Sequence, residues 1–184
     1  MGAAAACGGS EPATSPSTAT SSAPAATSSA PAATSTTSAA KGNKVAFGTE
    51  ASVTDTDGLE QTPFTATLNV SLRPGAIADL SGFQLAAQSK TSTPFYVHYT
   101  LTNTGSTPLK PATIAGMLDA YNDAGDRASS INLIGDFEKC PFSRPETLAL
   151  KASIKVCDVY LLPAGQKVSR VEFGRPDVKA TWQS

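Results

Sequence analysis

Residues 12–40 consist entirely of alanine, serine, threonine and proline, and this run limits where the chain can fold. Side chains this small bury too little apolar surface to offset the entropy lost on ordering the backbone. We therefore expect a disordered spacer at residues 11–43, preceded by a short distinct segment at residues 1–10. The aromatic residues, the long aliphatic residues and most charges follow from Lys44 onward, so we expect one folded domain at residues 44–184.

Alternation of apolar and polar residues dominates the predicted domain. Within residues 95–103 the apolar row is Phe95, Val97, Tyr99 and Leu101, which predicts a strand with one buried face. Residues 65–72 alternate in the same way, and Asn-Thr-Gly-Ser at 103–106 supplies a turn. Further strands are expected at 45–47 together with 51–54 (one strand, kinked at Gly48), 117–121, 155–162, 168–173 and 178–182. About seven short strands separated by turn residues predict an all-β antiparallel sandwich.

Other segments of the domain carry weaker patterns. Residues 77–80 are expected to form a helical turn, and residues 128–142 a long loop that bears Cys140. In the strand at 155–162, Cys157, Val159 and Leu161 share one face. Tyr96 and Tyr160 are predicted to point outward, where tyrosines combine contact area with a hydroxyl and can belong to a binding face.

Cys140 and Cys157 form an even pair within the predicted domain, 17 positions apart. As a disulfide they would stabilise the fold by about 3 kcal/mol. The alternative is two unrelated reduced thiols in a cytosolic protein. We favour the disulfide, because the spacer is typical of proteins exposed to an oxidising exterior.

Four motifs in the domain resemble those of actinobacterial lipoproteins with an immunoglobulin-like domain of unknown function, which are related to secreted mycobacterial immunoglobulin-like antigens. The motifs are Ala-Asp-Leu-Ser-Gly-Phe at 78–83, Thr-Pro-Phe-Tyr-Val at 93–97, Leu-Thr-Asn-Thr-Gly at 101–105 and Cys-Asp-Val-Tyr-Leu-Leu-Pro-Ala-Gly at 157–165. The resemblance implies an immunoglobulin-like sandwich and a disulfide between Cys140 and Cys157. It implies no catalytic residue.

The segment at residues 1–10 resembles the end of a bacterial lipobox, which predicts lipid attachment at Cys7. Two or more acyl chains on that cysteine would anchor the protein stably to a membrane. The segment departs from the pattern, because Ala4 stands where leucine is usual and only six residues precede Cys7. A gene start placed too late would explain the second departure. The alternative is an exposed free cysteine in an alanine-rich stretch.

Candidate chemical groups are few and scattered. His98, the only histidine, is expected on the outward row of its strand, without the convergent partners that a metal or catalytic histidine needs. Asp55 with Asp57, and Asp123 with Asp126, have spacings that occur in calcium loops but are also typical of hairpin turns. We predict no catalytic residues, no metal site and no cofactor.

These observations favour a membrane-anchored extracytoplasmic or secreted lipoprotein that acts as a non-catalytic binding or interaction module. The alternatives are an extracytoplasmic metal or small-ligand carrier, which would use His98 and the turn carboxylates, and a structural envelope component. The expected partners are the membrane, through the lipid anchor, and an envelope protein or glycan. Nucleic acid is not expected, because basic and acidic residues are balanced.

Overall fold

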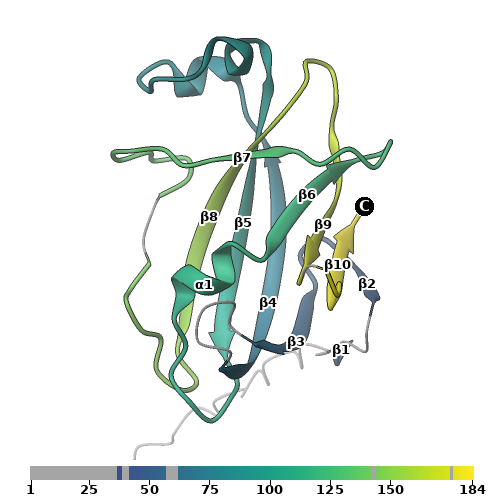
Figure 1. Ribbon diagram of the computed structural model, residues 1–184, viewed down its shortest axis with the longest axis vertical. Helices are drawn as coiled ribbons and strands as arrows, with labels where there is room; N and C mark the ends of the chain where they lie inside the picture. The colour runs from purple at the N-terminus through teal and green to yellow at the C-terminus, as the bar shows by residue number, and fades with distance from the viewer. Residues whose placement is uncertain (1–36, 39–41, 57–61, 142–143, 175) are drawn as a thin grey trace, which may run out of the picture. The chain divides into compact units, whose positions relative to one another are not determined.

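The computed structural model describes residues 37–38, 42–56, 62–141, 144–174 and 176–184, and strands are their main regular structure (Figure 1). The strands are β1 (Thr37–Ser38), β2 (Asn43–Ala46), β3 (Glu50–Thr56), β4 (Pro63–Pro74), β5 (Thr93–Asn103), β6 (Leu118–Asn122), β7 (Ser129–Ile131), β8 (Ser153–Leu162), β9 (Val168–Phe173) and β10 (Ala180–Gln183). The helical segments are η1 (Ile77–Leu80), η2 (Ala87–Thr91) and α1 (Pro111–Ala115). No helix in these ranges is long and apolar enough to cross a lipid bilayer. Cys7 lies outside the described residues.

The strands form two sheets, with the orders β1-β3-β4-β5-β8-β7 and β2-β10-β9-β6. Neighbouring strands are antiparallel, as predicted, except that β1 pairs with β3 and β2 pairs with β10 in parallel. β1 falls within the stretch predicted as a spacer. Each sheet contributes one face to a shared core, so the domain is an all-β, immunoglobulin-like sandwich.

The prediction of one kinked opening strand is wrong, because β2 and β3 belong to different sheets. Gly48 separates them with a φ of 83°, a left-handed conformation that favours glycine. The amide of Thr49 closes the turn on the carbonyl of Ala46 at 3.1 Å. The indole of Trp182 donates a hydrogen bond to the carbonyl of Thr49 at 2.9 Å, which joins this turn to the last strand.

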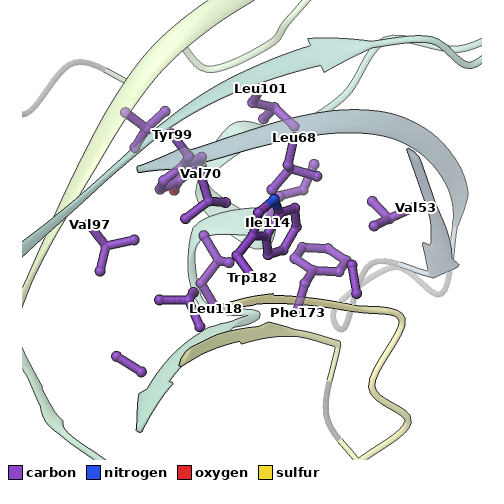
Figure 2. Close-up of a cluster of buried hydrophobic side chains, with 14 of the residues drawn as sticks. Val53, Leu68, Val70, Val97, Tyr99, Leu101, Ile114, Leu118, Phe173 and Trp182 are labelled. Atoms are coloured by element: carbon purple, nitrogen blue, oxygen red, sulfur yellow. The ribbon is translucent and has the colours of Figure 1, made fainter. Parts of the chain in front are cut away.

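The main core lies between the sheets and contains the predicted inward row of β5 (Figure 2). Leu68 and Val70 of β4 enter it from the same sheet, and Phe173 and Trp182 from the opposite one. Ile114 of α1 also points into the core, which explains why this short helix forms between two strands. The inward prediction for residues 95–101 is confirmed.

β8 is buried on both faces; Cys157, Val159 and Leu161 share one of them, as predicted, but the outward prediction for Tyr160 is wrong. Val156, Tyr160 and Leu162 enter the main core, and the Tyr160 hydroxyl donates a hydrogen bond to the carbonyl of Leu118 at 2.7 Å. Cys157, Val159 and Leu161 lie on the outer face of the six-stranded sheet, beneath a second apolar layer. Tyr160 is therefore not part of a surface. Tyr96 does lie on the outer face, but that layer buries it.

Candidate ligand-binding face

A second, smaller apolar cluster covers part of the outer face of the six-stranded sheet. We call it the outer cluster; its buried members are Leu80, Tyr96, Cys140, Cys157, Val159 and Leu161. Two segments lie over it and together form what we call the cap: residues 75–92, between β4 and β5, and residues 129–141, which contain β7 and the loop after it. The helical turn predicted at 77–80 is confirmed as η1.

Aromatic contacts join the cap to the sheet. The Phe137 ring meets Tyr96 at a centroid distance of 5.4 Å and Phe83 at 5.5 Å, both edge to face. Such pairs stabilise by about 0.5–1.5 kcal/mol beyond the area that they bury. A Cβ on Gly75 would lie 2.5 Å from the Tyr96 ring, so only glycine fits where the chain leaves β4.

The disulfide fixes the cap covalently. Cys140 in the cap is bonded to Cys157 in β8, with the two Cα atoms 5.2 Å apart. The two cysteines are thus joined, as predicted, and the bond pins the 129–141 segment to β8. Because a disulfide of this kind persists in oxidising compartments, it is the described feature that bears most directly on location.

A polar network fastens the other half of the cap. Asp79 accepts hydrogen bonds from the Tyr96 hydroxyl at 3.0 Å and from Nζ of Lys139 at 2.6 Å. The Lys139 contact, followed by one from the Ala76 amide, lowers the pKa of Asp79 from its ordinary 3.8 to about 2. Burial, together with the Asp79 contact, raises the pKa of Tyr96 far above the physiological range.

A groove with a volume of about 480 Å³ runs where the cap ends and the polar part of the outer face begins. We call it the basic groove. Its side of the sheet carries Arg73 on β4, His98 on β5 and Lys155 on β8. Its cap side carries Asp79, Glu138 and Lys139. Nε2 of His98 lies 3.9 Å from Sγ of Cys157, so the histidine contacts the disulfide directly.

His98 is half-buried on the outer face, as the strand pattern predicted. Burial lowers its pKa below the ordinary 6.5, and the charge of Arg73 lowers it further. The imidazole is therefore neutral at pH 7.

A second hollow of about 270 Å³ lies at the free edge of β8, beyond the end of β7. Arg144 and Asp158 line it and form an ion pair. Desolvation raises the pKa of Asp158, although Arg144 opposes that shift. The Tyr99 hydroxyl is buried beside Asp158 without a hydrogen bond of ordinary geometry to any described residue.

The predicted turn carboxylates lie elsewhere. Asp126 is held within the turn after β6, where its amide donates to Oδ1 of Asn122 at 2.7 Å. Asp123, in the same turn, lines a hollow beside β9 and not the basic groove. Asp55 lies 4.0 Å from Nζ of Lys179, and Asp57 is outside the described residues. Among the described residues, no group of three or more His, Cys, Asp or Glu side chains is arranged to hold a metal ion.

The groove and the cap were not predicted from the sequence. Arg73 and Lys155 had no pattern to distinguish them from ordinary surface charges. A signal for the cap did exist: β8 is apolar at 156, 157, 159, 160, 161 and 162, which requires cover on both faces, and Phe83 and Phe137 stand in segments otherwise typical of loops.

The fold and this face together define a β-sandwich module with a disulfide-pinned cap. In its fold the chain is similar to MPT63, a secreted protein from Mycobacterium tuberculosis, with a TM-score of 0.56 and 12% sequence identity over 79% of this chain and 99% of that chain. At this identity the similarity shows the fold alone. No protein-family model matches the chain, and no curated protein does.

Proposed function

We propose that this protein is an extracytoplasmic, non-catalytic binding module that uses the outer face of its six-stranded sheet, next to the cap, to hold a ligand. The observation that carries the proposal is the disulfide-pinned cap itself. It leaves the basic groove on this face and a second hollow, beside Arg144 and Asp158, at the edge of the sheet, instead of the flat solvated surface usual for such a sheet.

The location rests on two further points. A disulfide between Cys140 and Cys157 suits an oxidising compartment, and the structural neighbour is described as a secreted protein. Lipid attachment at Cys7 would tether the module, and residues 11–43 would act as the spacer that lets it reach a ligand beyond the membrane.

Binding to isolated envelopes tests the function. The full chain, labelled at a surface lysine, is titrated onto envelopes from cells that lack it, alongside a C140S/C157S variant. We expect saturable binding that weakens at least several-fold in the variant, because the released cap no longer shapes the face. Binding that does not saturate, or that is equal in the two proteins, would contradict the proposal.

Cell fractionation tests the anchor separately. In cells that produce the protein, the wild type should remain with the membrane and carry a diacylglyceryl group on Cys7. A C7S variant should appear in the medium or the extracytoplasmic fraction. Finding that Cys7 of the wild-type protein is unmodified would contradict the lipid anchor, but it would not contradict the proposed binding function.

A further inference from the structure

We infer that the basic groove binds an oxyanion group, a phosphate or sulfate carried by the ligand, between Arg73, His98 and Lys155. This inference rests on the proposed function, because it names the ligand class for the same face. In the groove, Arg73 of β4 and Lys155 of β8 flank His98 of β5, the strand between them. The imidazole of His98 can donate or accept a hydrogen bond.

The strand register brings these side chains together. His98 on β5 is directly opposite Ser71 of β4 on one side and Cys157 of β8 on the other. Arg73 is two residues beyond Ser71, and Lys155 two residues before Cys157, so both are diagonal neighbours of His98 on the same face. Diagonal neighbours have Cα atoms about 7–8 Å apart, within reach of long side chains. Arg73 and Lys155 therefore approach His98 from opposite sides.

The charges of the groove favour an anion. The groups facing His98 are Arg73 from β4, Lys155 from β8, and Asp79, Glu138 and Lys139 from the cap. Asp79 and Lys139 neutralise each other through their 2.6 Å contact. The remaining charges are the cations of Arg73 and Lys155 and the carboxylate of Glu138, which leaves a net positive charge. Protonation of His98 would add a third cation. Arg, Lys and imidazolium are the donors that bind phosphate and sulfate oxygens in proteins.

The groove suits a group carried on a larger ligand. Arg73 and Lys155 are exposed, while His98 is half-buried at the floor against the disulfide. An oxyanion seated on His98 would thus be held at the floor with the rest of the ligand directed outward. A volume of about 480 Å³ is sufficient for a sugar phosphate.

His98 supplies the test, because it is the only histidine and its Hε1 proton therefore gives the one histidine Hε1 signal in the NMR spectrum. The purified full chain is titrated with sodium sulfate, which keeps its charge throughout the titration, and with sodium chloride at matched ionic strength. We expect a saturable shift with sulfate alone and a higher His98 pKa in the bound state. R73Q and K155Q should each weaken sulfate at least about tenfold, as loss of one charged hydrogen bond does.

The variant K90Q is the control, because it makes the same change at an exposed lysine that does not line the groove. A response to sulfate no larger than the response to chloride overturns the inference, as does equal sulfate affinity in R73Q, K155Q and K90Q. Glucose 1-phosphate and phosphatidylglycerol vesicles, followed through the same signal, separate a glycan source from a lipid headgroup. Failure here would leave the envelope-binding result intact, since that measurement does not depend on the charge of the ligand.

Discussion

The hydroxyl of Tyr96 donates a hydrogen bond to Oδ2 of Asp79 over 3.0 Å, and this contact joins the sheet to the segment that leaves it. The same tyrosine ring contacts Phe137 from the other cap segment. Tyr96 thus contacts both parts of the cap from the sheet. Changes that disturb its position should loosen the cap before they affect the main core, which lies on the other face.

A first prediction concerns the glycine beneath this ring. We expect G75A to lower the free energy of unfolding by about 1–3 kcal/mol, because its Cβ would lie 2.5 Å from the ring and force it to move. Urea unfolding gives the free energies. G82A is the matched control, since nothing lies within 4 Å of a Cβ at Gly82 in the same cap segment. Equal losses in the two variants would mean that the Tyr96 position does not limit the cap.

A second prediction concerns the stability of the fold at acidic pH. The folded pKa of Asp79, about 2, lies below its ordinary value of 3.8. Its carboxylate therefore stabilises the fold at pH values above about 4, and this contribution disappears as the pH falls from about 4 to about 2. We expect D79N to be less stable than the wild type at pH 7 and to lose less stability across this acid window.

Urea unfolding between pH 2 and pH 7 checks the acid prediction. The control is D136N, which removes an exposed carboxylate from the other cap segment. If D79N and the wild type lost stability in parallel from pH 4 to pH 2, the contacts of Asp79 with Tyr96 and Lys139 would not contribute to folding.

The sequence predicts one part of this structure well and another poorly, and β5 and β8 show why. The inward row of β5 was predictable, because its outward row contains Thr100 and Thr102 and period two is unambiguous. In β8 both rows are apolar, so alternation cannot say which row faces the main core. The cap was missed for a related reason: its apolar residues are spaced irregularly, and their burial depends on a surface made by strands distant in sequence. The disulfide pairing was predictable, because it needed only two cysteines in the domain.

The third prediction compares two buried tyrosines. We expect Y160F to lower the free energy of unfolding by about 1 kcal/mol or more, because the Tyr160 hydroxyl donates to the carbonyl of Leu118 in the opposite sheet. Y99F should change it by less than about 0.5 kcal/mol or raise it, because the Tyr99 hydroxyl is buried without a regular hydrogen bond to a described residue. Thermal and urea unfolding measure both. A Y99F variant that loses as much as Y160F would show that the Tyr99 hydroxyl does hydrogen-bond to Asp158, which lies beside it.

The last prediction concerns the ion pair at the edge of β8. Arg144 and Asp158 are each about 15% exposed, so removing one charge leaves the other poorly solvated. We expect R144Q to lower the free energy of unfolding at pH 7.5 by about 3 kcal/mol, and the double variant R144Q/D158N to lose less than R144Q alone.

The pH dependence of the stability of R144Q follows from the direction in which the pKa of Asp158 is shifted. Because desolvation raises the folded pKa of Asp158, the folded state takes up a proton more readily than the unfolded state. The cost of burying its charge is therefore absent at low pH and grows as the pH rises through the folded pKa. Without Arg144 this pKa should rise further, so R144Q should recover part of its stability at pH 5 while R144Q/D158N should not. Urea unfolding of both variants at pH 5 and pH 7.5 decides the matter: a pH-independent loss in R144Q would show that the arginine acts through packing and not through its charge.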